Sequence, residues 1–246
     1  MYIKNPAHQF AFFIEELLSG TLVISADPIL YHRITRVLKC KIGTTVLLFD
    51  EQRHAQAELI NYTKKECIFK VIAIKRNIPL LPTITLGLPL LKGNDLEEAI
   101  SFATQVGVSN IQLLVTHYTQ RPFTFTAEKK RLMRVIIAAT EQSKRFCMPT
   151  IQEPIPFCEL KNIYPKDTFF FGMKDGISMH TLLRYNVVKN EQSSFLFIVG
   201  PEADFSLTEY DHLKEWKAEG ISLGPTVLRS CTAAGIGVNY LRMLAL

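Results

Sequence analysis

Residues 194–234, SFLFIVGPEADFSLTEYDHLKEWKAEGISLGPTVLRSCTAA, decide the fold of this chain. The apolar runs FLFIVGPE and ISLGPTVLR each break at a Gly-Pro pair, and a helix-forming segment follows each break. Residues 195–199 are apolar without interruption and rich in aromatic and β-branched side chains, which is typical of a strand buried on both faces of a parallel sheet. The stretch therefore predicts a strand, a turn and a helix twice in succession.

Capping signals give the expected ends of the two helices. Ser206 and Glu209 have the spacing of a capping box, so we expect the first helix to begin there and to end near Gly220 as a left-handed C-cap. The second unit predicts a strand at residues 221–223 and Thr232 as a cap of the terminal helix. Both units fit an α/β fold with a parallel sheet.

Two Gly-Pro pairs, at 200–201 and 224–225, follow the predicted strands. A single Gly-Pro pair after a strand is a common way for a strand to end and would indicate a turn rather than a binding site. Here one pair is followed by Glu202 and the other by Arg229. Because open α/β sheets bind ligands at the carboxyl ends of their strands, the two loops together favour a binding site.

The N-terminal part has a different pattern. Residues 21–75 alternate short apolar runs with turns, which predicts a small β-barrel or sandwich. One helix interrupts the strands, with Asp27 as its cap and Pro28 at its first position. Its apolar face is expected to carry Leu30, Ile34, Val37 and Leu38.

The opposite face of this helix is basic. His32, Arg33, Arg36 and Lys39 follow at spacings of three and four residues, and such a stripe can neutralise several phosphates. A solvated helix face has the same spacing, so the residues alone leave both interpretations open.

Residues 76–82, RNIPLLP, contain two prolines and predict a linker between a first domain, 1–76, and a second, 77–246. The second domain begins with an apolar strand, a helix from Asn94 to Gly107 and a further strand, IQLLV, the order of a right-handed parallel crossover. A long helix is expected over residues 127–146, and a strand, DTFFFGMKD, is expected to end near Gly172.

Composition limits the function classes. The chain has 246 residues, a formal net charge of +5 and a pI near 8.9, which permits nucleic acid as a partner. Five cysteines without a C-x-x-C pair argue against a disulfide framework or a zinc site, and no metal is expected. No apolar run is long enough to span a bilayer, so we expect a soluble cytoplasmic protein without a membrane partner.

The segments GPEADFS and LGPTVLRSCTAA resemble the two signature segments of the RsmE-type SPOUT-superfamily RNA methyltransferases. The segments YHRITRVLKCKIGTTVLLFD, LKGNDLEEAISFATQVGV, HYTQRP and EQSKRFCMPTI are similar to further family segments, so the resemblance extends over nearly the whole chain. The chain departs from the family pattern in the signature segments, where glycine, glycine, arginine, threonine and glutamate are replaced by Ala203, Asp204, Thr226, Ser230 and Cys231.

The resemblance implies a fold and an activity. It implies a trefoil-knotted parallel sheet preceded by a PUA-like β-barrel that docks RNA, and a homodimer. The implied reaction is S-adenosyl-L-methionine-dependent methylation of N3 of a uridine in 16S ribosomal RNA of the small ribosomal subunit. Because N3 methylation needs no covalent adduct, we interpret Cys231 as a packed small residue rather than a thiolate nucleophile.

The resemblance also implies roles for individual residues. Glu202 is expected to orient or deprotonate the uracil N3–H, and Arg229 to hold a phosphate or the cofactor carboxylate. Taken alone, Glu202 could be a solvated loop charge and Arg229 a partner in a salt bridge to a neighbouring helix. The cofactor is expected to contact Gly172, Gly200, Pro201, Leu223, Gly224 and Leu228. The RNA is expected to contact His32, Arg33, Arg36, Lys39, Arg121, Lys144 and Arg145.

Three other functions stay open from the sequence. The replaced glycines make a non-catalytic RNA-binding protein with the SPOUT fold conceivable. A methyltransferase acting on another RNA or another ring position would share the same motifs. A nucleotide-dependent metabolic enzyme of ordinary doubly wound type is a weaker alternative, because no G-x-G-x-x-G or G-x-x-x-x-G-K-[ST] motif is present.

Overall fold

The computed structural model of the chain describes residues 9–17, 22–63, 66–119, 122–184 and 193–244. It divides into two compact units, of which the first comprises Met1–Ile78 and Thr140–Cys147 and the second Pro79–Ala139 and Met148–Leu246. The division falls inside the predicted linker, but the return of residues 140–147 to the first unit was not predicted. No helix among the described ranges is long and apolar enough to cross a bilayer.

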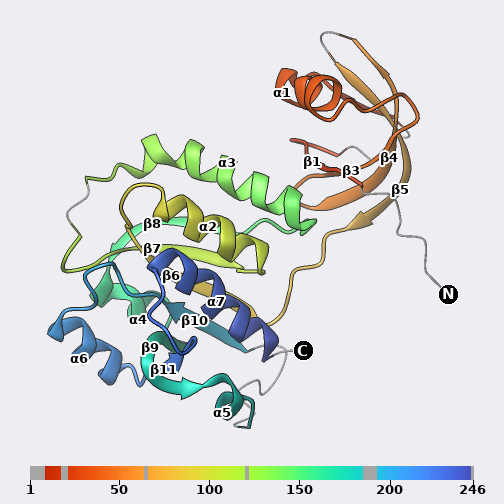
Figure 1. Cartoon of the computed structure of the whole chain (residues 1–246). Helices are drawn as coiled ribbons and strands as arrows, with labels where there is room; N and C mark the ends of the chain where they lie inside the picture. Colours follow the sequence, from red (N-terminus) through yellow and green to blue (C-terminus); the bar gives the residue numbers. More distant parts are fainter. Residues whose placement is uncertain (1–8, 18–21, 64–65, 120–121, 185–192, 245–246) are drawn as a thin grey trace. The chain divides into compact units, whose positions relative to one another are not determined.

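The first unit is built on a curled five-stranded sheet (Figure 1). Strands β1 and β3 are parallel, whereas the other neighbouring pairs are antiparallel. The concave core contains Phe12, Leu48, Leu59 and Phe69, all fully buried. The strand order is β1 (Ala11–Phe13), β3 (Thr45–Phe49), β4 (Arg53–Tyr62), β5 (Cys67–Arg76) and β2 (Leu22–Ser25). Four of these strands match the predicted runs, and β1 was not predicted.

The helix of this unit begins as predicted but changes its pitch. The Asp27 carboxylate accepts a hydrogen bond from the Ile29 N–H (2.8 Å) at the start of α1 (Pro28–His32). The helix then continues as a π-helical segment, η1 (Arg33–Val37). Because this segment has more residues per turn than an α-helix, the face rotates, and Val37 is 61% exposed while Ile34 stays buried. The prediction that Val37 is buried was therefore wrong.

The second unit is a fully parallel six-stranded sheet. Its strand order is β11 (Glu219–Ser222), β9 (Thr168–Ser178), β10 (Ser194–Ile198), β6 (Thr83–Pro89), β7 (Asn110–Val115) and β8 (Thr150–Pro156). The chain runs outward from β6 to β8 and then fills the other side of β6. The neighbouring strands β6 and β10 therefore mark the point at which the direction of winding changes.

Helices cover both faces of this sheet (Figure 1). One face packs against α2 (Asp95–Gln105), α3 (Phe125–Ser143) and α7 (Ser230–Met243), and the other against η2 (Phe157–Glu159), α4 (Leu160–Ile163) and α6 (Leu207–Glu215). A further short helix, α5 (Met179–Arg184), follows β9. Alternate residues of β10 serve the two faces: Phe195 and Phe197 in one core, Leu196 and Ile198 in the other. This arrangement confirms the predicted α/β class, while the trefoil knot stays a prediction.

The structure corrects several predicted boundaries. The capping box is present, with Ser206 and Glu209 exchanging hydrogen bonds, but α6 ends at Glu215, and Lys217 takes the left-handed conformation (φ 55°) instead of Gly220. Gly220 lies in β11, where a Cβ would come within 2.9 Å of the Met173 sulfur. It is therefore required for the close approach of two strands rather than for a helix end.

Two other helix ends differ from expectation. The terminal helix begins after Arg229, so Thr232 lies inside its first turn and is not its cap. The long helix α3 ends at Ser143, three residues before the predicted end, because Lys144 takes a left-handed conformation (φ 54°). The last turn of α3 and the residues that follow it, 140–147, belong to the first unit.

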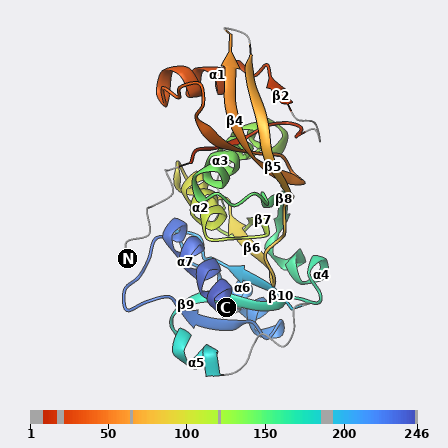
Figure 2. The ribbon, with the colours of Figure 1, turned by 90° about the vertical axis from the view of Figure 1, so that its right-hand side faces the viewer.

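Helix α7 packs closely on the sheet and lies beside α2 (Figure 2). Two of its residues, Gly235 and Gly237, are buried glycines. A Cβ at Gly237 would overlap the fully buried ring of Phe197, and a Cβ at Gly235 would lie 2.8 Å from the Phe102 Cβ. At its other end, the buried Arg242 donates hydrogen bonds to the Pro82 carbonyl (2.7 Å) and the Gly107 carbonyl (2.6 Å).

We predict that Gly237→Ala destabilises the second unit by about 1–3 kcal/mol, the usual cost of overpacking a core. The sign of the change in unfolding free energy is informative, since the same substitution in a helix without tertiary contacts would stabilise that helix by about 1 kcal/mol. Urea unfolding followed by the fluorescence of Trp216, the single tryptophan and part of the core under α6, measures the effect.

Gly235→Ala is the matched comparison for this prediction. It should cost less, because its one close contact is with the Phe102 Cβ at 2.8 Å, whereas a Cβ at Gly237 would overlap the enclosed Phe197 ring. Equal stability of Gly237→Ala and the wild type would show that the helix can shift on the sheet.

Candidate active site

A cavity of about 670 Å³ opens at the carboxyl ends of the central strands of the second unit. Its size falls within the range of small-molecule and cofactor sites. The loops after β10 and β11 form most of its wall, with residues of β9 and the start of α2 completing it. All eight residues predicted to bind the cofactor or to act in catalysis line this cavity: Gly172, Gly200, Pro201, Glu202, Leu223, Gly224, Leu228 and Arg229.

The position of the cavity follows from the strand order. Helix α2 follows β6 and α6 follows β10, and these helices cover opposite faces of the sheet. The loops that precede them therefore separate at this edge and leave a crevice, as at the switch point of other open α/β sheets. One hydrogen bond joins the two loops, from the Lys92 N–H to the Glu202 carboxylate (2.8 Å).

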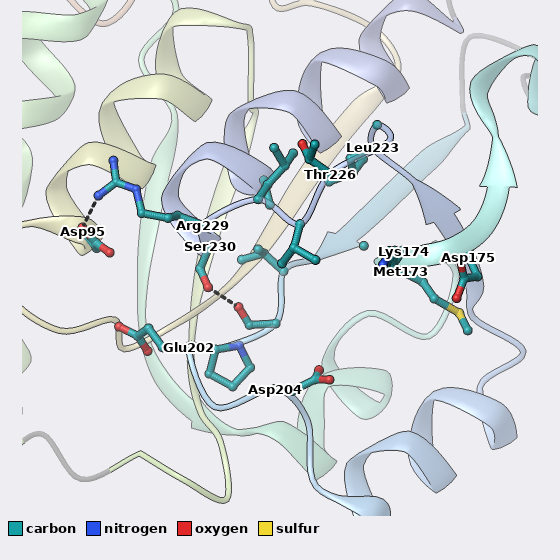
Figure 3. A pocket seen from close by; sticks show the side chains of 18 of the residues that line it. Asp95, Met173, Lys174, Asp175, Glu202, Asp204, Leu223, Thr226, Arg229 and Ser230 are labelled. Carbon is teal, nitrogen blue, oxygen red and sulfur yellow. Dashed lines mark hydrogen bonds and ion pairs between the residues drawn. The ribbon is translucent and has the colours of Figure 1, made fainter.

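A second hydrogen bond joins the two Gly-Pro loops. The Ser230 hydroxyl donates to the Gly200 carbonyl (2.7 Å), which ties the end of β10 to the first residue of α7 (Figure 3). The family pattern has threonine at this position, and serine keeps the hydroxyl that the hydrogen bond requires. This departure from the pattern is therefore conservative.

Asp204 occupies a backbone conformation that favours glycine. Its φ angle is 63°, in the left-handed region that aspartate tolerates better than most residues. The side chain is fixed, because its Oδ1 accepts hydrogen bonds from the Phe205 N–H (2.8 Å) and the Tyr210 hydroxyl (3.0 Å). Burial, followed by this hydrogen bond and the charge of Asp204, raises the pKa of Tyr210 to about 12, so the phenol stays a donor at neutral pH.

The two predicted catalytic residues lie at the rim of the cavity (Figure 3). Glu202 is exposed, and the hydrogen bond from Lys92 engages its Oε1. The Arg229 guanidinium lies 3.5 Å from the Asp95 carboxylate and 3.5 Å from the Glu98 carboxylate, both in the first turn of α2. The expected alternative, an ion pair with a neighbouring helix, is thus present, although the Arg229 side chain is still 67% exposed.

Ligand atoms of Asp95, Glu98 and Cys231 lie within 4.8 Å of one another. Exposed acidic groups often gather without binding a metal ion, and here Arg229 compensates the two carboxylates. Cys231 is fully buried and is absent from the cavity wall. Its thiol is therefore placed as a packed small side chain, in agreement with the interpretation from the sequence.

The second loop and β9 complete the wall. Leu223 and Leu228 are partly buried and pack against the main core, with their remaining surface in the cavity. Gly172 directly follows the last residue of β9 that pairs with β10, Phe171. The predicted end of the strand was wrong, because β9 continues to Ser178 beside β11.

Sequence reasoning missed several residues of the wall. Polar residues that follow an apolar strand run are the signal that could have found Lys174 and Asp175, which come two and three residues after the predicted glycine. Asp95 and Tyr210 belong to helices and carry no local signal of a site. The missed residues include Asp95, Met173, Lys174, Asp175, Val199, Asp204, Tyr210, Thr226, Val227, Ser230 and Ala233.

The predicted RNA contacts that the structure describes all belong to the first unit. His32, Arg36, Lys39 and Lys144 are exposed, and Arg145 is half-buried. Arg121 lies outside the described residues. The separation of these residues from the cavity residues into two units is consistent with the predicted roles, which stay predictions.

Arg33 differs from its neighbours in the basic stripe. Its guanidinium forms a two-pronged ion pair with Glu141 (3.0 and 2.6 Å) and lies over the Phe12 ring. Glu141 is 8% exposed and also accepts a hydrogen bond from the Phe13 N–H. Arg33 therefore balances a buried carboxylate inside the first unit, whereas Arg36 of the same helix is exposed.

The chain matches the sequence model of a family described as the RNA methyltransferase domain, over residues 79–241. The chain belongs to this family. The match begins at Pro79, four residues before β6, runs almost to the end of α7 and includes the whole cavity wall. The family membership expected from the signature segments is thus confirmed.

Relatives named as rRNA methyltransferases share most of their length with this chain. A Ribosomal RNA small subunit methyltransferase E of Rickettsia conorii is 29% identical over 87% of this chain and 86% of its own. A protein of the same name from Mesomycoplasma hyopneumoniae is 26% identical over 92% and 95%.

Solved structures confirm the fold. A Ribosomal RNA small subunit methyltransferase E from Neisseria gonorrhoeae, bound to S-adenosylmethionine, superimposes with a TM-score of 0.79 at 23% identity, covering 96% of this chain and 98% of the other. A Legionella pneumophila protein in complex with S-adenosylmethionine gives 0.81 at 22% identity with the same coverage. The predicted fold, a parallel-sheet domain that follows an N-terminal β-barrel domain, is confirmed, with the barrel present as a half-barrel, the curled sheet of the first unit.

We predict that Arg36→Gln and Arg33→Gln have different effects. Loss of one phosphate contact at Arg36 should weaken binding to a 16S RNA fragment and lower the slope of log affinity against log salt by about 0.7–0.9. Arg33→Gln should leave this slope unchanged and lower the melting temperature, because Glu141 loses its partner. Fluorescence anisotropy at several salt concentrations and thermal melting measure the two effects. An equal loss of slope in both variants would place Arg33 on the RNA.

Proposed function

We propose that this protein transfers a methyl group from S-adenosyl-L-methionine to N3 of a uridine in the 16S ribosomal RNA of the small ribosomal subunit. Membership of the RNA methyltransferase family and the names of the full-length relatives support the reaction and the substrate. The observation that carries the proposal is the cavity, because it gathers all eight residues that the family resemblance selects.

The residues of the cavity fit this cofactor. Loops at the ends of strands offer backbone N–H and C=O groups, and the glycines allow the ligand to approach the backbone closely. Leu223 and Leu228 offer apolar surface for a purine ring. When bound, S-adenosylmethionine supplies a methyl group made electrophilic by a sulfonium; the chain must then hold the acceptor nitrogen in line and remove its proton.

Glu202 is suited to receive this proton. The Lys92 N–H fixes the carboxylate through Oε1, which leaves Oε2 able to accept a hydrogen bond from an incoming uracil N3–H. Because the Glu202 side chain is exposed at the rim of the cavity, a uracil base of the RNA can reach it from solvent without rearrangement of the sheet.

Arg229 is suited to hold an anion. Its two contacts with α2 are long, at 3.5 Å, and most of the side chain is exposed, so the guanidinium can exchange a carboxylate partner for a phosphate or for the cofactor carboxylate. The nearby Asp95 and Glu98 would then hold Arg229 in the free protein and position it for the ligand.

The N-terminal domain, residues 1–76, is assigned to RNA docking as a PUA-like module, and residues 77–246 to methyl transfer. The exposed cations of the first unit support this division. We assign the protein to the cytoplasm, because its proposed substrate is ribosomal RNA. We also assign it a homodimeric state, supported by Val227, an apolar residue of the cavity loop that is 80% exposed and that a second copy could cover.

Methylation of small ribosomal subunits tests the reaction. Subunits from a strain that lacks the protein should accept radiolabelled methyl groups from S-adenosylmethionine, and mass mapping should place one 3-methyluridine in 16S RNA. Modification at another ring position or in another RNA would support the alternative substrate. If the protein neither bound S-adenosylmethionine nor transferred its methyl group, the result would favour the alternative of a non-catalytic RNA-binding protein.

We predict that Glu202→Gln lowers the rate of methyl transfer about 10²–10⁴-fold, the contribution of a general base, without changing the affinity for the methyl donor. Single-turnover assays and calorimetry separate the two quantities. Glu219→Gln is the matched control, because this exposed carboxylate lies outside the cavity wall and its loss should leave both quantities unchanged. A rate within threefold of the wild type in Glu202→Gln would exclude the proposed base.

For Arg229→Gln we expect weaker binding of an anion. The assay shows whether this anion is the carboxylate of the methyl donor or a phosphate of the RNA. Weaker binding of the methyl donor would assign the guanidinium to the cofactor carboxylate, and weaker binding of RNA alone would assign it to a phosphate. Equilibrium dialysis with labelled donor and anisotropy with labelled RNA measure the two affinities. If both equal those of the wild type, Arg229 serves only the ion pairs with α2.

A further inference from the structure

We propose that Asp204 is a binding residue that recognises the positive charge of the methyl donor. This inference rests on the proposed function, since it concerns how the same cavity selects its ligand. The family pattern has glycine at this position, so the carboxylate is a property of this chain rather than of the signature segment.

The first argument is the charge of the cavity wall. Four carboxylates line it and two cations oppose them, so the wall carries an excess of negative charge. A cationic ligand is favoured in such a cavity over a neutral one of the same shape. The carboxylates are Asp95, Asp175, Glu202 and Asp204, and the cations are Lys174 and Arg229.

The second argument is that the other carboxylates are occupied or less fixed. Asp95 pairs with Arg229, and Glu202 receives the Lys92 N–H. Within the described part of the chain, no lysine, arginine or histidine forms an ion pair with Asp204, and Asp175 has no hydrogen bond that would fix it. Asp204 is thus a carboxylate of the cavity wall that is held in place by hydrogen bonds and whose negative charge is not balanced by an ion pair with the described residues.

The third argument is preorganisation. Both hydrogen bonds to Asp204 reach Oδ1, from the Phe205 N–H and the Tyr210 hydroxyl, and leave Oδ2 without a partner among the described residues. The left-handed backbone (φ 63°) and these two donors fix the carboxylate before any ligand arrives. Figure 3 shows Asp204 on the side of the cavity that contains Met173, Lys174 and Asp175, whereas Glu202 lies toward Asp95 and Arg229. The two carboxylates of this loop therefore serve different parts of the cavity.

S-adenosylmethionine carries two positive groups, the sulfonium and the α-ammonium, and either could face Asp204. Three ligands distinguish them: S-adenosylmethionine has both charges, S-adenosylhomocysteine has only the ammonium, and methylthioadenosine has neither. All three share the adenosine and the sulfur, so differences between them report the charged groups.

The test is the affinity of the wild type and of Asp204→Asn for these three ligands. Asparagine keeps the size of the side chain, the acceptor for Tyr210 and the tolerance of a left-handed backbone, and it removes the charge. We expect Asp204→Asn to bind S-adenosylmethionine about three- to fivefold more weakly, as for loss of one exposed ion pair, and to bind methylthioadenosine as the wild type does. An equal loss for S-adenosylhomocysteine assigns Asp204 to the ammonium, and a loss for the methyl donor alone assigns it to the sulfonium.

Displacement of radiolabelled S-adenosylmethionine gives all the affinities on one scale. Asp211→Asn is the matched control. Asp211 is an exposed aspartate of α6 outside the cavity wall, and its substitution removes the same net charge as Asp204→Asn. It should leave the three affinities unchanged. Unchanged binding of the methyl donor in Asp204→Asn overturns the proposal, and so does an equal loss for methylthioadenosine, which would show that Asp204 only shapes the loop. A wild-type protein that binds none of the ligands overturns the proposed function itself, and this inference with it.

Discussion

The burial of β10 on both faces determines where this protein can bind a ligand. The strand lies between β6 and β9 near the middle of a parallel sheet, and its side chains alternate between two apolar cores. Its backbone hydrogen bonds are satisfied by its neighbours until Ile198, the last residue that pairs on both sides. Beyond this residue the chain must turn, and the backbone groups of Gly200 and the following loop become available. The cavity forms at the one edge where buried strands release their backbone into solvent together.

Much of this architecture could be predicted because it is encoded locally. Uninterrupted apolar runs identified the buried strands, and the spacing of Ser206 and Glu209 identified the start of α6. The eight cavity residues chosen from the sequence lie together because two Gly-Pro loops follow parallel strands, whose carboxyl ends meet at one edge. The family resemblance selected the individual residues, and the topology explains why they lie close together.

The structure adds features that the sequence pattern did not show, some from contacts distant in sequence and one from a local change of helix pitch. Gly220 has the appearance of a helix cap, but the neighbouring strand requires a residue without a side chain there. Arg33 belongs to a regular basic stripe, but its partner Glu141 lies 108 residues further along the chain. Val37 follows the helical period, but a π-helical segment moves it into solvent. Long-range packing overrode the local pattern at Gly220, a local change of helix pitch did so at Val37, and the ion pair of Arg33 joins segments that no local pattern connects.

The hydrogen bonds of Arg242 have a consequence for the order of events during synthesis. This residue stands near the carboxyl end of the chain, yet it holds the carbonyl before β6 and the carbonyl after α2. The first crossover of the second unit therefore stays incomplete until the last helix has left the ribosome. The first unit also stays incomplete until residues 140–147 have been synthesised, since they belong to it. A nascent chain released before residue 147 would contain neither unit in finished form, so these truncated products should be unfolded and open to proteolysis instead of persisting as competing RNA binders.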